Sequence, residues 1–166
     1  MMAGKTEFIL NSKKVTASGD ASRPLLKSLR EEFRLKSLKE GCGRGECGTC
    51  TVLLEGKPVA SCMIMTGQVS GKKVYTLEGL LETEEMKLLI DCYANCGAVQ
   101  CGFCTPGFLI VSYALLKQNP SPTRVQIRQA MAGNVCRCTG YTKIIDSVME
   151  ASAYLNDNET QKKGKK

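Results

Sequence analysis

Residues 41–62 are GCGRGECGTCTVLLEGKPVASC, and this stretch holds four of the ten cysteines of the 166-residue chain. The four are Cys42, Cys47, Cys50 and Cys62, spaced as C-x4-C-x2-C with eleven residues before the fourth. That spacing is typical of a plant-type [2Fe–2S] site, whereas structural zinc usually takes C-x2-C pairs. The glycines allow a tight loop to turn backbone N–H groups toward an anionic group. The stretch therefore predicts a [2Fe–2S] cluster bound by these four thiolates.

Four more cysteines form a second quartet in the other half of the chain. Cys101 and Cys104 lie in QCGFCTPG, and Cys136 and Cys138 lie in NVCRCTGY, with thirty-one residues between the two pairs. Because C-x2-C and C-x-C pairs also suit zinc, the spacing of this quartet alone does not distinguish a [2Fe–2S] cluster from a zinc ion. The chain has no histidine, so a Rieske-type site with two histidine ligands is excluded.

The first half of the chain predicts short strands around one helix. Apolar residues at helical spacing after Pro24 predict a helix as far as Phe33. The last strand of a second hairpin would carry Cys62 to the first quartet. Alternating patterns bounded by turn residues predict the strands, at 6–10, 13–16, 51–54, 59–63 and 73–76.

The second half predicts helices at 84–95, 107–117 and 124–132, followed by a last helix that carries Ile144 and Leu155. Thr123 would cap the third of these. Thr105-Pro106 and Thr139 indicate helix starts directly after cysteine pairs, which would direct two positive helix ends at the second quartet. The segment 108–116 is apolar on nearly every side, which indicates burial in a bundle or under a partner.

Composition excludes several classes of protein. Two [2Fe–2S] cores held by eight thiolates would lower the formal charge of +7 to about +3. There is no basic patch with interleaved aromatic residues, so we expect no nucleic-acid binding. No apolar run approaches the roughly 20 residues that cross a bilayer, and MMAGKTEFIL has no apolar signal segment. We therefore expect a cytoplasmic protein without membrane insertion, where ten cysteines indicate metal rather than disulfides.

The stretches GCGRGECGTCTVLLEGKPVASC, GAVQCGFCTPG and GNVCRCTGY together resemble the iron–sulfur subunit of the molybdenum hydroxylases, the xanthine dehydrogenase and aldehyde oxidoreductase family. The resemblance covers about residues 6–155 and implies an α+β fold. A ferredoxin-like β-grasp [2Fe–2S] domain at 1–80 would precede an all-α four-helix-bundle [2Fe–2S] domain at 81–157, followed by a flexible basic tail at 158–166. The resemblance also implies a large subunit with a molybdenum–pterin cofactor and a medium subunit with FAD. This chain would transfer electrons and carry no catalytic residue for the substrate.

The resemblance assigns roles to particular residues. The first quartet matches the family's distal cluster, and the second matches the cluster nearer the pterin. Gln100 matches a glutamine that hydrogen-bonds the pterin, and Cys138 matches the cysteine whose surroundings touch the pterin amino group. An amide offers a donor and an acceptor to the edge of a heterocycle. Without the resemblance, Gln100 would be interpreted as an ordinary hydrogen-bonded polar residue.

Two other functions fit the same cysteines. A free-standing ferredoxin would need no partner, but the apolar segment 108–116 argues against it unless the bundle covers that segment. A zinc-stapled interaction module would replace each cluster by one ion. Within the molybdenum hydroxylases, the substrate could be a purine, nicotinate, an aldehyde, carbon monoxide or an aromatic acyl-CoA thioester. We favour a purine or related N-heterocycle, as in a xanthine-type dehydrogenase.

Cys92 and Cys96 belong to neither quartet. They lie four residues apart on the predicted helix 84–95 and its end, so they share a face. Two thiols without further ligands hold no cluster. We expect both to be buried as small apolar side chains, and not to form a third metal site or a redox switch.

Overall fold

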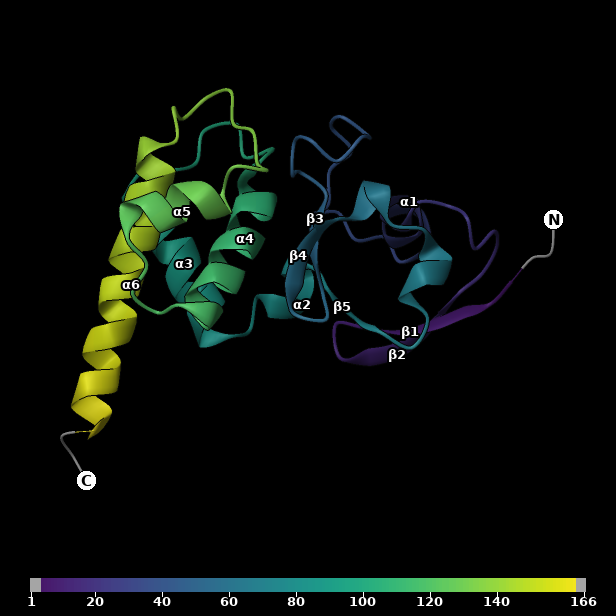
Figure 1. The fold of residues 1–166 in the computed structure, drawn as a ribbon, viewed down its shortest axis with the longest axis horizontal. Coiled ribbons are helices and arrows are strands. Elements are labelled where there is room, and N and C mark those ends of the chain that lie inside the picture. The colour runs from purple at the N-terminus through teal and green to yellow at the C-terminus, as the bar shows by residue number, and fades with distance from the viewer. Residues whose placement is uncertain (1–3, 164–166) are drawn as a thin grey trace.

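The structure is a computed structural model that describes the backbone of residues 4–163 and the side chains of residues 4–157. A sheet and a group of helices lie beside each other, and the cysteine-bearing loops of both reach the same end of the molecule (Figure 1). The observed architecture is therefore α+β, with a β-grasp sheet followed by a helical domain, as the sequence predicts.

The sheet of the N-terminal half has the strand order β2-β1-β5-β3-β4 within the described residues. The β1 and β5 strands pair in parallel, and the other neighbours pair antiparallel. Four of the predicted strands are confirmed to within a residue at each end. The observed strands are β1 (Thr6–Leu10), β2 (Lys13–Ala17), β3 (Thr51–Leu54), β4 (Lys57–Ala60) and β5 (Lys73–Tyr75).

The strand predicted at 59–63 is wrong beyond Ala60. The chain turns there into a short 3-10 helix, η2 (Ser61–Met63), and a second one follows as η3 (Thr66–Val69). The amide and the hydroxyl of Ser61 both donate to the carbonyl oxygen of Cys50, at 3.3 and 2.7 Å. The amide bond continues the pairing by one residue pair, and Cys62 after it lies in η2 and not on a strand.

The regular helix predicted after Pro24 is also wrong in part. It begins as α1 (Leu25–Lys27) but widens into the π-helical turn η1 (Ser28–Glu32), where the amide of Phe33 bonds to the carbonyl oxygen of Ser28. Leu25 and Leu26 of α1 and Leu29 of η1 are all buried in the core that the sheet covers. The resulting core combines this segment with the strands and includes Phe8, Leu10, Leu25, Leu26, Leu29, Val52 and Val74.

The helical half begins with α2 (Leu77–Leu80) and α3 (Glu84–Asn95), whose N-cap is Thr83. It continues with α4 (Thr105–Gln118), α5 (Arg124–Ala130) and α6 (Thr142–Lys163). The cap of α5 is Thr123, as predicted, and its side chain shares a capping box with Gln126.

Helix α4 lies at the centre of the molecule, between β3 of the sheet and helices α3, α5 and α6 (Figure 1). Phe108, Ile110 and Val111 on different sides of this helix are all buried. Its one buried hydroxyl, that of Ser112, bonds to the Phe108 carbonyl and to Tyr93. The apolar segment 108–116 is thus covered by this chain itself, so its composition does not argue against a free-standing carrier.

The last helix begins later than predicted. Thr139 does not cap it, because Tyr141 takes a left-handed backbone conformation with φ of +69° and α6 begins at Thr142. The helix continues through Lys163, so the backbone of 158–163 extends α6 and residues 164–166 lie outside the described part. The flexibility expected of 158–166 and the division at residue 80 stay predictions. No helix of residues 4–163 is long and apolar enough to cross a membrane.

Candidate metal centres

The β3–β4 hairpin brings two cysteines of the first quartet together. The register pairs Thr51 with Ala60, so Cys50, just before β3, and Cys62, just after β4, emerge at the same end of the hairpin. The bonds of Ser61 to Cys50 hold this end closed. The thiols of Cys50 and Cys62 are in contact as a result.

The other two thiols of the first quartet, Cys42 and Cys47, lie on the glycine-rich loop. The amide of Cys42 donates to the sulfur of Cys47 at 3.4 Å. The amides of Arg44 and Glu46 donate to the sulfur of Cys42 at 3.4 and 3.3 Å. These amides, Arg44 first, lower the pKa of Cys42 to about 6, whereas burial followed by contact with Cys50 raises the pKa of Cys62 to about 11. The loop therefore presents backbone N–H groups to sulfur, as an anionic cluster requires.

The second quartet is also arranged as two pairs of thiols. The sulfurs of Cys101 and Cys138 lie 3.6 Å apart and are exposed. Cys104 and Cys136 are in contact and lie deeper, and Cys136 is buried. Cys104 is the N-cap of α4, so one positive helix end is at this site, as predicted. The start of α6 is separated from Cys138 by the turn 139–141.

The surroundings of the second quartet also favour thiolates at particular positions. The amide of Phe103, followed by contact with Cys138, lowers the pKa of Cys101. Burial, followed by contact with Cys136, raises the pKa of Cys104 to about 12. Burial alone would raise the pKa of Cys136, but the hydroxyl and amide of Thr139 lower it on balance.

The thiol arrangement fits a diiron cluster. Each quartet consists of two contacting pairs, and a [2Fe–2S] core presents two irons that each take two thiolates. A structural zinc ion would instead require all four sulfurs around one point. Among the residues whose side chains are described, no three His, Cys, Asp or Glu are gathered as a single metal ion would need.

The two quartets are joined by a direct contact between their loops. The amide of Val135 donates to the carbonyl oxygen of Cys47 at 3.0 Å. The side-chain amide of buried Asn134 donates to the carbonyl oxygen of Gly48 at 3.2 Å. A Cβ atom on Gly48 would collide with Asn134 and lie 2.6 Å from the carbonyl oxygen of Gly133. A Cβ atom on Gly107 would collide with Gly48 in turn. Only glycine at 48 and 107 allows this approach.

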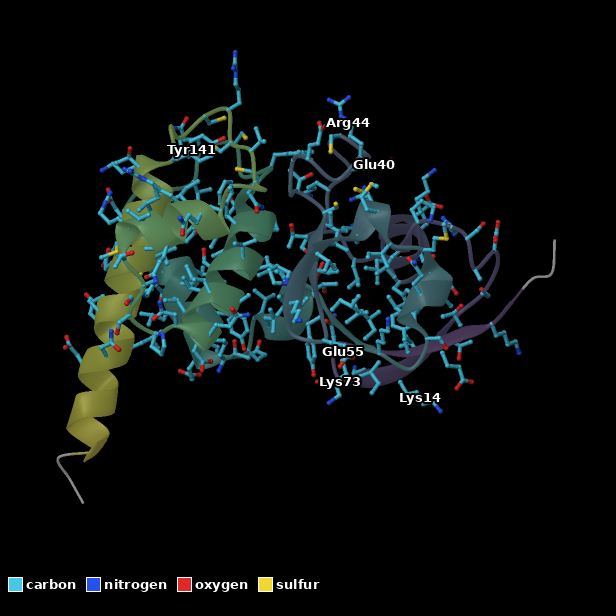
Figure 2. All side chains as sticks on the ribbon, in the orientation of Figure 1. Lys14, Glu40, Arg44, Glu55, Lys73 and Tyr141 are labelled. Carbon is cyan, nitrogen blue, oxygen red and sulfur yellow. The ribbon has the colours of Figure 1, made fainter. Side chains whose placement is uncertain are left out.

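Four exposed apolar side chains lie within three residues of a cysteine of the second quartet, and they are called the apolar patch here: Val99, Phe103, Val135 and Tyr141. Each of these side chains is between 37 and 51% exposed. Gln100 is exposed beside Cys101, and no hydrogen bond joins its side chain to another described residue. Figure 2 shows Tyr141 and Arg44 at the same end of the molecule, each on a ligand-bearing loop.

The two remaining cysteines differ from each other. Cys92 is buried, as predicted. The prediction for Cys96 is wrong, because its half-buried thiol donates to the carboxylate of Glu150 on α6 at 2.8 Å. This bond, followed by burial, raises the pKa of Cys96, so the thiol stays protonated and links α3 to α6.

Two residues that matter to the sites were missed by sequence reasoning. Asn134 was not singled out, although it directly precedes the Val135-Cys136 pair. Thr139 was interpreted as a helix cap, but its hydroxyl donates to the sulfur of Cys136 at 3.1 Å. A threonine next to a ligand cysteine was the available signal for Thr139. Nothing near Asn134 in the sequence indicates its contact with Gly48, 86 residues away.

Fold and sites together define a two-domain protein with one [2Fe–2S] site in each domain. The family model of the "2Fe-2S iron-sulfur cluster binding domain" matches residues 8–76, and that of the "[2Fe-2S] binding domain" matches residues 76–149. The chain is 47% identical over 142 residues to the nicotinate dehydrogenase small FeS subunit of Eubacterium barkeri, covering 86% of this chain and 90% of that subunit.

Two further comparisons agree. The xanthine dehydrogenase iron-sulfur-binding subunit of Escherichia coli O157:H7 is 45% identical over 129 residues, which is 76% of this chain and 80% of that subunit. The crystal structure of quinoline 2-oxidoreductase from Pseudomonas putida 86 superimposes with a TM-score of 0.87 at 37% identity, covering 94% of this chain and 97% of that one.

The chain belongs to the iron–sulfur small subunits of the molybdenum hydroxylases, the xanthine dehydrogenase and aldehyde oxidoreductase family. It is an electron-transfer subunit of a molybdenum-dependent hydroxylase or dehydrogenase complex and has two [2Fe–2S] domains. In this family the partner subunits carry the molybdenum–pterin cofactor and FAD.

Proposed function

We propose that this chain passes electrons one at a time from a molybdenum–pterin site on a large subunit to FAD on a medium subunit or to another acceptor. Cys101, Cys104, Cys136 and Cys138 would hold the cluster nearer the pterin, and Cys42, Cys47, Cys50 and Cys62 the distal cluster. Each [2Fe–2S] cluster, when bound, supplies a centre that accepts and releases one electron. The observation that carries this proposal is the pairing of thiols in both quartets together with the contact between their loops.

The face around the second quartet supports docking of the large subunit there. The residues of the apolar patch lie on the same loops as the exposed pair Cys101 and Cys138, so a partner that covers these loops would bury apolar surface together with the thiols. Gln100 extends from the same face with its amide available to a heterocycle edge. We propose Gln100 and the surroundings of Cys138 as the contact with the pterin.

The contact between the loops supports transfer from one domain to the other. One hydrogen bond, from the amide of Val135 to the carbonyl of Cys47, connects the residue before Cys136 to a ligand of the first quartet. Buried Asn134 adds a second hydrogen bond across this junction, to the carbonyl oxygen of Gly48. This chain would therefore act as a rigid link, and we propose no catalytic residue on it.

We further propose an N-heterocycle, such as a purine, as the substrate of the complex. The support is similarity to proteins named for nicotinate, nicotine, xanthine and quinoline. Aldehyde oxidoreductases are also similar: the solved one from Desulfovibrio desulfuricans ATCC 27774 is 38% identical, with a TM-score of 0.85 and 92% of this chain covered but 17% of its own. We propose the cytoplasm as the location, where ten cysteines stay reduced.

An anaerobic experiment on the native assembly tests the function. The complex is mixed with xanthine, nicotinate, quinoline or an aldehyde, and electron paramagnetic resonance follows the clusters. We expect both cluster signals to appear with an N-heterocycle, and the isolated chain to hydroxylate none of these compounds. Hydroxylation by the isolated chain would refute the electron-transfer role. A brown monomer with both clusters and no partner in native extract would favour a free-standing carrier.

A further inference from the structure

Cys136, Thr139 and Tyr141 form a closed ring of hydrogen bonds beside the second quartet. The amide of Cys136 donates to the phenol oxygen of Tyr141 at 3.0 Å, and the amide of Tyr141 donates to the hydroxyl oxygen of Thr139 at 3.3 Å. The hydroxyl of Thr139 donates to the sulfur of Cys136 at 3.1 Å, and the amide of Thr139 donates to the same sulfur at 3.4 Å. Gly140, between them, has a left-handed φ of +65° and turns the chain so that the amide of Tyr141 faces back to Thr139.

The ring fixes the direction of the Thr139 hydroxyl. Its oxygen already accepts a hydrogen bond from the amide of Tyr141, and its own O–H is directed at the sulfur of Cys136. In a chain of hydrogen bonds each bond polarises the next, which strengthens the last one. The sulfur of Cys136 is buried, so water does not compete for this bond.

The other threonines next to ligand cysteines are arranged differently. The hydroxyl of Thr49 lies 3.3 Å from the sulfur of Cys47, but it also donates to the carbonyl oxygen of Lys39 at 3.1 Å. A hydroxyl has one proton, so that carbonyl competes with the sulfur. Thr105 directly follows Cys104, yet no hydrogen bond connects its hydroxyl to a sulfur within residues 4–157. The hydroxyl of Thr51, directly after Cys50, donates to the carbonyl oxygen of Gly48 at 2.7 Å. Among these four threonines, Thr139 is the one whose geometry commits its proton to a ligand.

From this geometry we infer that Thr139 is a positioning residue that raises the reduction potential of the second cluster through its hydrogen bond to Cys136. Reduction adds negative charge to the cluster and its sulfurs, and a donor bonded to sulfur stabilises that added charge. Removing the donor therefore makes the cluster harder to reduce. The inference rests on the proposed function, because it requires Cys136 to be a ligand of the second cluster.

The test is a redox titration of the assembled holoprotein, monitored by electron paramagnetic resonance, with Thr139→Val. We expect the affinity of the second cluster for an electron to fall on the order of tenfold, a shift of about 59 mV to more negative potential for a one-electron couple. The first cluster is an internal control and keeps its potential. Thr139→Ser retains the hydroxyl, so we expect the potential of its second cluster to lie close to that of the unaltered protein.

Two further variants make the result decisive. Thr105→Val removes a hydroxyl beside a ligand of the same cluster and is expected to leave both potentials unchanged. Thr139→Ala replaces Thr139→Val if the larger side chain prevents assembly. An unchanged potential of an intact second cluster in Thr139→Val or Thr139→Ala would overturn the inference, as would an equal shift in Thr105→Val. Absence of a second cluster signal from the unaltered protein would instead contradict the proposed function.

Discussion

The backbone amide of Val135 donates a 3.0 Å hydrogen bond to the carbonyl oxygen of Cys47 and so connects the two ligand loops across the domain junction. Cys47 belongs to the glycine-rich loop of the β-grasp domain, and Val135 directly precedes Cys136 in the helical domain. The relationship explains why glycine stands at position 48 and why Asn134 is buried. Two small domains, each with its own core, are held in one relative position at the point where their sites approach.

Asn134→Ala tests the strength of this junction. The substitution removes the Asn134 donor from the carbonyl of Gly48, which still accepts from the amide and hydroxyl of Thr51, so we expect a cost on the order of 1 kcal/mol. We expect the midpoint of thermal unfolding, measured anaerobically, to fall by about 2–4 °C for each kcal/mol. The matched control is Asn95→Ala on the exposed end of α3, where we expect a change within about 0.5 kcal/mol. Equal effects of the two substitutions would show that the junction contributes nothing.

Gly48→Ala, compared with Gly71→Ala, separates the effect of the close approach between Gly48 and Asn134 from the strain of a left-handed backbone. Gly48 and Gly71 have nearly the same φ, +69° and +70°, but a Cβ at Gly71 would meet nothing within 4 Å. Gly71→Ala should therefore cost only the left-handed strain, on the order of 1 kcal/mol. Gly48→Ala adds the collision with Asn134, and we expect weaker domain docking, seen as faster proteolysis between the domains. Identical protease sensitivity of the two variants would contradict the packing described here.

Cys50→Ser tests whether each quartet works within its own domain. We expect loss of the paramagnetic signal of the first cluster and retention of the second, because the core of the helical domain is built mainly from α2 to α6. Cys138→Ser should do the reverse and abolish transfer of electrons from molybdenum. Analysis of iron and acid-labile sulfide gives the number of clusters that each variant retains. Simultaneous loss of both signals in Cys50→Ser would contradict two independent sites.

The lowered pKa of Glu78 predicts part of the pH dependence of the free energy of unfolding. Burial alone would raise its pKa, but bonds from the hydroxyl and amide of Ser37 and from Thr76 lower it below the ordinary 4.5. Because the folded-state pKa is the lower one, the stabilisation is present above about pH 4.5 and is lost as pH falls through the folded-state pKa. Chemical unfolding between pH 3 and 7 should show this loss in the unaltered protein.

Glu78→Gln provides the comparison for that measurement. The variant should be less stable than the unaltered protein near neutral pH, and the difference should shrink at acid pH. Glu40→Gln, which changes an exposed carboxylate on the loop between η1 and β3 (Figure 2), is the control. A constant difference between Glu78→Gln and the unaltered protein across the whole range would exclude a titrating contribution of Glu78.

Local patterns in the sequence were sufficient for much of the fold. The hairpins, the cap Thr123 and the start of α4 at Thr105 depend on neighbours within a few residues, so spacing and residue type reveal them. The same holds for the grouping of eight cysteines into quartets, since the four ligands of each site follow a characteristic order. Their assignment as ligands remains a proposal that the thiol pairs support.

Contacts between distant residues could not be predicted in the same way. The π-helical turn η1 depends on how three leucines meet the sheet, and the bend at Ser61 depends on the carbonyl of Cys50. Thr139 looked like a helix cap because capping and bonding to sulfur use the same hydroxyl. Which of the two it does depends on the turn at Gly140 and Tyr141, both of which have a positive φ, and a positive φ at a tyrosine is not indicated by residue type.

The central claim is that the two quartets each hold a diiron cluster, and Mössbauer spectroscopy of the 57Fe-enriched native assembly, with sulfide analysis, tests it most directly. We predict two irons and two acid-labile sulfides for each quartet, in two spectroscopically distinct [2Fe–2S] clusters. A single metal ion in either quartet, or disulfides between its cysteines, would contradict the account.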